Sequence, residues 1–263
     1  MGIEFLIVTI YLICVVYVLY QMALSVEDKL EDQVKIVLDG DILESEIATQ
    51  LQQQKLYQAE TEIQTDKTAR LKMTFFNQQE EAIGNVTLQV TPFGKQTLEP
   101  PIRNLDVSIV NTLPNQQVFI NWDYSSISVY GNSAQRVIRG VPGNPIDLHT
   151  PQVVTVVNPG LQTTVPVTNE GLLSRSENQI ALGSGAALVD LKKIPNMKES
   201  LRHYSLQILM WVRSMSDPDS PALQLLIPFV FKIEVLPDHV ALPVLSWLLK
   251  FNPFSPKPSQ KTR

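Results

Sequence analysis

One uninterrupted apolar run near the N-terminus constrains this chain more than any other feature. No charged side chain occurs from Phe5 to Val26. As an α-helix rising ~1.5 Å per residue, these 22 residues would extend ~33 Å, enough to cross a ~30 Å hydrocarbon core. A lone segment in lipid can pair all of its backbone N–H and C=O groups only as a helix. The run therefore predicts a single transmembrane anchor over residues 1–26.

Aromatic side chains near the C-terminal end of the run suit the membrane boundary. Tyr17 and Tyr20 can place their amphipathic rings at headgroup level. Acidic residues from Glu27 onward end the run. The side chains that we expect to hold the anchor in lipid are Phe5, Leu12, Val16, Tyr17 and Tyr20.

A cleaved signal peptide is the competing interpretation. Ala23-Leu24-Ser25 has small residues at the spacing of a cleavage site. However, the residues before Phe5 include no Lys or Arg, and the run is longer than the ~7–15 apolar residues of a usual signal. We therefore favour a retained anchor. Only Lys29 and Lys35 flank the run, which leaves orientation weakly determined. A domain that follows an N-terminal anchor is often exported, so we expect the body outside the cytoplasm.

Residues 27–80 predict a helical, glutamine-rich region. Asp41 and Glu44 have the spacing of a helix start, and neither Gly nor Pro interrupts residues 41–83. Apolar residues recur every four positions after that start, at Leu43, Ile47 and Leu51. This helix is either a stalk that binds a partner or an amphipathic helix packed on the body, and the second interpretation is favoured.

From about Asn85 the apolar period changes from four to two. The sharpest alternation is Leu223–Val235, where every odd position is apolar. Pro228 inside it cannot donate to a ladder, so we expect this strand at an edge or broken by a bulge. The other strand candidates are residues 86–90, 105–109, 118–122, 127–129, 136–139, 153–157, 163–167 and 203–213.

Strands at this spacing predict a mainly β fold. Residues 81–237 are expected to form an antiparallel β-sandwich or a barrel, with Trp122 in its core. An immunoglobulin-like topology is the first expectation, by fold analogy. The only cysteine, Cys14, lies in the apolar run and supplies no intramolecular disulfide.

The segment 238–263 has two interpretations that the sequence leaves open. Apolar and aromatic residues lie beside a cation at Trp247, Leu248, Lys250 and Phe251. One interpretation is an interfacial segment that contacts the headgroup boundary. The other is a short C-terminal helix packed on the body, followed by a Pro-rich tail.

Neither charge nor motifs point to a catalytic chemistry. The net charge of −5 gives no reason to expect nucleic acid as a partner. His149, His203 and His239 are far apart and lack metal-ligand spacing. Nucleophile-elbow and phosphate-loop motifs are absent from the sequence, so we expect no catalytic residue, cofactor or metal.

Two functions follow from these observations. The first is a non-catalytic, single-pass membrane protein that holds a protein partner at the bilayer. The alternative is a membrane-anchored module or hydrolase that acts on a small molecule or polysaccharide, using loop residues that the sequence does not identify.

Overall fold

The computed structural model describes residues 2–30, 33–54, 58–77, 79–140, 150–175, 182–184, 186–217 and 219–236. The chain divides into two compact units. One joins residues 1–33 to residues 236–263, and the other is the body, residues 34–235.

The N-terminal unit contains helix α1 (Gly2–Leu30). Among the described residues, only this helix is long and apolar enough to cross a membrane, in its segment Glu4–Met22. A signal sequence near the N-terminus meets the same criteria of length and composition. None of this segment is buried in the protein. Four of the expected anchor side chains are largely exposed and Tyr20 is half-buried. The fractions exposed are 75% for Phe5, 61% for Leu12, 55% for Val16 and 62% for Tyr17.

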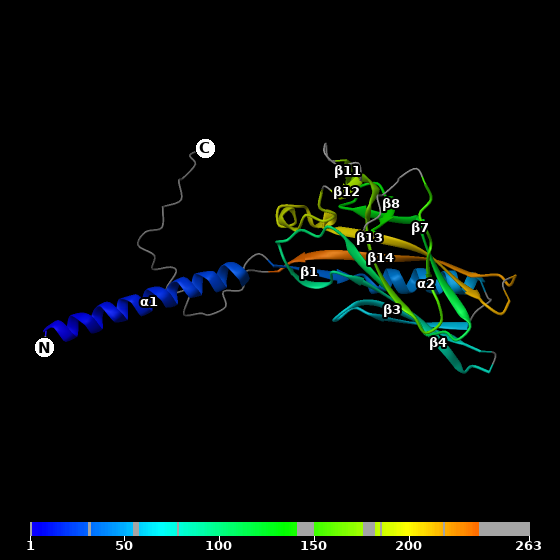
Figure 1. Ribbon diagram of the computed structural model, residues 1–263, viewed down its shortest axis with the longest axis horizontal. Helices are drawn as coiled ribbons and strands as arrows, with labels where there is room; N and C mark the ends of the chain where they lie inside the picture. The colour runs from blue at the N-terminus through cyan, green and yellow to red at the C-terminus, as the bar shows by residue number, and fades with distance from the viewer. Residues whose placement is uncertain are drawn as a thin grey trace. The chain divides into compact units, whose positions relative to one another are not determined.

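The described part of the body is mainly antiparallel β (Figure 1). Twelve strands form one sheet in the order β2-β3-β4-β6-β10-β8-β7-β13-β14-β1-β5, with β9 paired to β7, and β11 and β12 form a separate hairpin. The strands are β1 (Gln33–Leu38), β2 (Gln58–Gln64), β3 (Ala69–Phe76), β4 (Ala82–Thr91), β5 (Gly94–Thr97), β6 (Leu105–Asn111), β7 (Gln116–Val129), β8 (Gln135–Arg139), β9 (Thr155–Val157), β10 (Gln162–Asn169), β11 (Leu173–Arg175), β12 (Leu182–Ser184), β13 (His203–Ser214) and β14 (Leu223–Val235).

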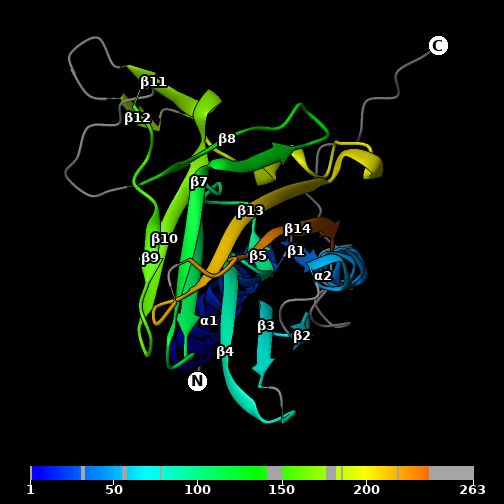
Figure 2. The ribbon, with the colours of Figure 1, turned by 90° about the vertical axis from the view of Figure 1, so that its right-hand side faces the viewer.

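The sheet curls into a half-barrel around a filled interior (Figure 2). Alternate residues of each long strand point inward, because successive side chains of a strand project to opposite faces. The rings of Tyr204 and Phe231 stack with their centroids 4.8 Å apart. Trp122 is 1% exposed, as expected of a core residue, and its Nε1 donates to Thr155 Oγ1 at 2.8 Å.

The antiparallel β class is confirmed, whereas the immunoglobulin-like topology is not shown. Strand β8 pairs with β7 through Ser126 and Arg136, and with β10 through Val167 and Arg139. It thereby joins what would be two sheets of a sandwich into one curled sheet.

Helix α2 (Gly40–Gln54) runs along the edge of β14 where β1 ends. Its Leu43 and Ile47 are fully buried, which confirms that the helix packs on the body. Beyond the end of β1, two glutamine side chains of α2 make the backbone hydrogen bonds with β14 that a neighbouring strand would make. The Gln50 amide accepts from Leu226 N at 2.8 Å and donates to Leu226 O at 2.7 Å, and the Gln54 amide makes the same pair of bonds with the backbone of Gln224.

The end of β1 explains how a proline is accommodated in β14. Pro228 pairs in register with Gln207 of β13, and β1 does not extend to it, since its last partner there is Phe231. Its missing N–H therefore breaks no ladder bond with β1. We expected this strand at an edge or broken by a bulge. Strand β14 lies between β13 and β1 and is not an edge strand, although Pro228 is in the half that β1 does not cover.

The prediction of helix across residues 27–80 is wrong at Gln33–Leu38, which is strand β1, and again beyond Gln54. Residues 58–64 and 69–76 are strands β2 and β3, in which burial alternates every second residue as β pairing requires. The helix also begins one residue earlier than expected. Asp39 Oδ1, not Asp41, accepts from a first-turn amide, Ile42 N, at 3.4 Å.

The expected C-terminal helix and the segment with Trp247, Leu248, Lys250 and Phe251 lie outside the described residues.

Candidate interaction surface

A row of side chains crosses four neighbouring strands on the outer face of the body. Val156 of β9 pairs with Phe119 of β7, Phe119 with Trp211 of β13, and Trp211 with Gln224 of β14. Val156 is 45% exposed, and both aromatic side chains are half-buried. Because directly paired residues project to the same side of a sheet, these three side chains form one continuous apolar strip.

The next row widens the strip. Leu209 of β13 pairs with Leu226 of β14, which is 39% exposed. Leu209 itself is buried, at 9% exposed, so we refer to Phe119, Val156, Trp211 and Leu226 together as the outer apolar face.

An equivalent row on the other half of the sheet is entirely polar. Register places Arg70, Gln89, Ser108 and Thr164 beside one another on β3, β4, β6 and β10. Arg70 donates to Gln89 Oε1 at 3.1 Å, and the hydroxyls of Ser108 and Thr164 lie 2.7 Å apart. We call this the polar row. The row through Val156, Phe119 and Trp211 is therefore apolar where the polar row on the other half of the sheet is not.

A pocket of about 450 Å³ opens at one end of the outer apolar face. Phe119 and Trp211 line it from the sheet, and Arg213 and Asp219 add one charge of each sign. Ser220 and Ala222 complete the lining from the β13–β14 connection. Aromatic and Arg side chains around such a hollow are the composition of anchor pockets in protein interfaces and of ligand sites.

A β-bulge in β7 presents a tyrosine beside this face. Ser126 pairs with Gln207 and Asn121 pairs with Leu209, so four residues of β7 lie opposite one residue of β13. The Asn121 side chain holds the turn, since its Oδ1 accepts from the backbone N–H groups of the two residues that follow Trp122, at 3.1 and 3.3 Å. Tyr124 at the tip is 73% exposed. A bulge re-aims a side chain in this way at sites of recognition.

Ser125 locks the bulge to the neighbouring strand. Its hydroxyl donates to Asn121 O at 2.6 Å and accepts from Leu209 N at 3.1 Å. Ser125 is 1% exposed, so both bonds are shielded from water. Hydrogen bonds within the body therefore fix the backbone conformation that exposes Tyr124.

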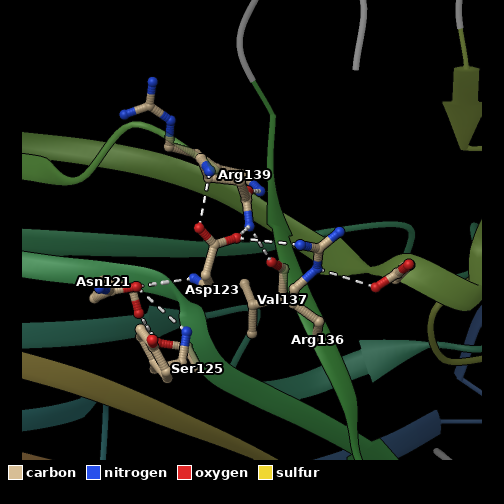
Figure 3. A network of polar contacts seen from close by, with 9 residues as sticks. Asn121, Asp123, Ser125, Arg136, Val137 and Arg139 are labelled. Atoms are coloured by element: carbon tan, nitrogen blue, oxygen red, sulfur yellow. Dashed lines mark hydrogen bonds and ion pairs between the residues drawn. The ribbon is translucent and has the colours of Figure 1, made fainter. Parts of the chain in front are cut away.

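A polar network fixes the other side of the bulge (Figure 3). Asp123 accepts from Gln152 twice, from its backbone N at 2.9 Å and its Nε2 at 3.0 Å. Arg136 joins Asp123 to Glu170, with Nη1–Oδ1 at 3.4 Å and Nε–Oε2 at 3.0 Å. Gln152 also accepts from Arg139 N at 2.8 Å. These contacts hold the segment that follows Gln152 against β7.

A second exposed apolar side chain lies on the segment that is bound to the bulge. Val153, immediately after Gln152, is 71% exposed. Its segment is bound to Asp123, whose neighbour in the chain is Tyr124. Both side chains face solvent on backbone that hydrogen bonds hold in place.

The residues singled out from sequence lie elsewhere. Those of the expected anchor are all on α1, and the four of the expected interfacial segment are outside the described residues. Within the part of the chain that the structure describes, no three His, Cys, Asp or Glu side chains gather as metal ligands would. Sequence reasoning missed Phe119 and Trp211. Both are large apolar residues at positions of their strands where the two-residue alternation calls for a polar, outward side chain. That departure from the alternation was the signal in the sequence.

No family model, curated protein or solved structure matches this chain, so a functional assignment depends on the surface itself.

Proposed function

We propose that the protein is a single-pass membrane protein whose body is a non-catalytic interaction subunit, with a partner protein docking on the outer apolar face. The observation that carries this proposal is the contrast between that face and the polar row. Contiguous exposed apolar side chains cost solvation free energy, and on soluble proteins they mark interaction sites.

The membrane part of the proposal depends on α1. Its apolar side chains from Phe5 to Leu19 are exposed, which suits a lipid environment. The body is proposed to lie outside the cytoplasm, as expected for a domain exported behind an N-terminal anchor.

The aromatic residues give the surface its proposed binding energy. Trp, Tyr and Arg are enriched among the residues that dominate protein interfaces. Asn121 and Ser125 hold the backbone of the bulge at Tyr124, so docking would require little ordering of the backbone there.

Site-specific photo-crosslinking in the native membrane tests the proposal. A photoreactive phenylalanine analogue at position 124 should give one defined adduct with a partner protein, and the same analogue at Gln89 of the polar row should not. Trp211→Ser should abolish the adduct, because loss of a central Trp weakens an interface by ~2–4 kcal/mol. Equal adducts from both positions, or an adduct that survives Trp211→Ser, would contradict docking on this face.

The pocket supports a second candidate function. An aromatic wall of Phe119 and Trp211 with Arg213 and Asp219 beside it also suits a sugar ring or a small aromatic molecule. Titration calorimetry with soluble oligosaccharides, on the native chain and on Asp219→Asn, separates the two functions. Saturable binding that Asp219→Asn weakens would favour the ligand-binding function over protein docking.

A further inference from the structure

Strand β2 forms one margin of the twelve-stranded sheet, next to helix α2 (Figure 2). All seven of its residues pair with β3 in one unbroken register, from Gln58 opposite Phe76 to Gln64 opposite Arg70. Among the described residues, no backbone group of β2 is hydrogen-bonded to a segment other than β3. Within this part of the chain, the outer edge of β2 is therefore a row of unpaired N–H and C=O groups, on which a further strand can pair.

The body protects its other strand edges. Gln50 and Gln54 of α2 cover the part of β14 that β1 does not reach. Strand β5, at the opposite margin of the sheet, has four residues and carries the exposed Lys95. Short strands, lysines, prolines and bulges are the features that keep an edge from pairing. Strand β2 has seven residues, with no Lys, no Pro and no shift of register, so these protections are missing from it.

A hollow of about 550 Å³ lies beside this edge. Its lining includes Leu51 of α2, Ala59 and Glu60 of β2, Phe76 of β3, and Glu80. Leu51 and Ala59 are partly buried and pack on the core, so the hollow has an apolar floor. A segment paired with β2 would present alternate side chains to this hollow. At strand-addition sites the backbone bonds supply affinity, and hollows for alternate side chains supply specificity.

The charge along β2 determines which segment fits. Glu60 and Glu62 are exposed and project from the same face of β2, and Glu80 adds a third carboxylate at the hollow. Lys72 pairs with Glu62 at 3.2 Å, whereas the described residues contain no ion pair to Glu60 or Glu80. Opposite charges on neighbouring strands attract, so a strand with Lys or Arg at alternate positions complements these carboxylates.

The same charges argue against a second copy of this chain as the occupant. Antiparallel pairing of two copies about Thr61 would place Glu60 of each copy opposite Glu62 of the other. Like charges directly opposite on neighbouring strands are destabilising. The edge therefore favours a different, basic chain.

We propose that β2 accepts an extended, basic segment of a partner protein as an additional strand, with the cations of that segment beside Glu60 and Glu62. This contact is separate from docking on the outer apolar face, because β2 adjoins β3, which carries part of the polar row on the other half of the sheet. It gives the body a second site for protein partners.

Peptide binding to the full chain in detergent tests this proposal. The probe is a fluorescent peptide that alternates Lys and Val and has seven residues, the length of β2, and fluorescence anisotropy measures its binding. A peptide with Glu in place of Lys tests the role of charge. Two further Lys–Val peptides, N-methylated at the lysines or at the valines, test backbone pairing, because a methylated nitrogen cannot donate a hydrogen bond.

We expect saturable binding of the Lys–Val peptide, binding at least ~tenfold weaker for the Glu peptide, and loss of binding for at least one N-methylated peptide. Amide hydrogen exchange at residues 58–64 should slow when the peptide binds. Glu60→Lys should weaken binding about three- to tenfold, because an attractive cross-strand pair becomes repulsive. Glu199→Lys, the same change at an exposed glutamate that precedes β13 and lies outside the hollow, should not. Equal binding of all Lys–Val peptides, or unchanged exchange at residues 58–64, would overturn the proposal.

Two other occupants of this edge would give different results. If another segment of this chain covered β2, residues 58–64 would exchange slowly without peptide and the peptide would not bind. If a second copy paired there, that protection would increase with protein concentration. Either result would overturn the proposal. Trp211→Ser should leave peptide binding unchanged, so failure of this site and failure of docking on the outer apolar face are separate results.

Discussion

Replacing Tyr204 by Phe should stabilise the body. Tyr204 is 0% exposed, and within the described residues its hydroxyl has no hydrogen-bond partner. Burial without a partner raises the pKa of this phenol, so the group stays neutral but still loses its bonds to water. A buried hydroxyl without a partner costs ~1–3 kcal/mol.

The magnitude follows from what Phe keeps and what it removes. The ring stacked on Phe231 is retained, and a single oxygen atom is lost from the core. We therefore expect Tyr204→Phe to raise the free energy of unfolding by ~1–2 kcal/mol, less than the full penalty because a small void remains. For a body of about 200 residues, each 1 kcal/mol corresponds to a rise in Tm of about 2–4 °C.

Urea unfolding, followed by tryptophan fluorescence to which buried Trp122 contributes, measures this change. Thr155→Val is the matched control, because it also removes a buried hydroxyl, but one that accepts from Trp122 Nε1 and from Arg139 Nη1 at 3.2 Å. It should lower the free energy of unfolding by ~1–3 kcal/mol. If Tyr204→Phe were destabilising to a similar degree, its hydroxyl would have to be bonded and the reasoning would be refuted.

Three further predictions concern the contacts that hold the body together. Gln50→Met with Gln54→Met should lower the free energy of unfolding by ~1–3 kcal/mol and promote self-association, because the edge of β14 loses its side-chain cover; denaturation and light scattering measure the two effects. The hydrogen bond from Lys232 lowers the pKa of the Asp39 carboxyl below its ordinary value. A lowered carboxyl pKa contributes stability above the unfolded-state pKa of ~3.9, and that contribution is lost as pH falls through the lower folded-state pKa. Asp39→Asn should therefore cost ~0.5–1 kcal/mol at pH 7 and less at pH 2 in unfolding curves, and an equal cost at both would contradict this assignment. Asp123→Ala removes the carboxylate that accepts from Gln152 N and Nε2, and should lower the free energy of unfolding by ~1–3 kcal/mol. Amide hydrogen exchange at residues 152–154 should become faster, as measured by mass spectrometry. Unchanged exchange would show that Asp123 does not hold this segment.

Much of the β architecture was predictable because burial on one face leaves a period of two in the sequence. The apolar odd positions of Leu223–Val235 correspond to β14, and the predicted strands near Val86, Leu105 and His203 correspond to β4, β6 and β13. These strands share one buried and one outward face, which is the condition under which alternation appears.

Strands β2 and β3 were missed for a local reason. The four-residue spacing of Leu43 and Ile47 is a strong helix signal, and without Gly or Pro after it nothing in the sequence marks where the helix ends. The alternation of Leu71, Met73 and Phe75 was the available correction, since all three are buried at every second position.

The bulge that organises the candidate surface also left a trace in the sequence. Buried residues of β7 are even-numbered at Val118, Ile120 and Trp122 and odd-numbered at Ile127 and Val129. Such a change of parity requires an irregularity in a continuous strand, but it was interpreted as two separate strands. The contacts that stabilise the bulge come from distant parts of the chain, and no local pattern reports them.

Measuring the intact mass of the natural protein, recovered from membranes after alkaline extraction, tests the proposed anchor most directly. The account predicts a chain that resists extraction and retains the whole of Phe5–Met22. A protein released into the soluble fraction with its first residue near Val26 would contradict it, because α1 would then be a signal that is removed.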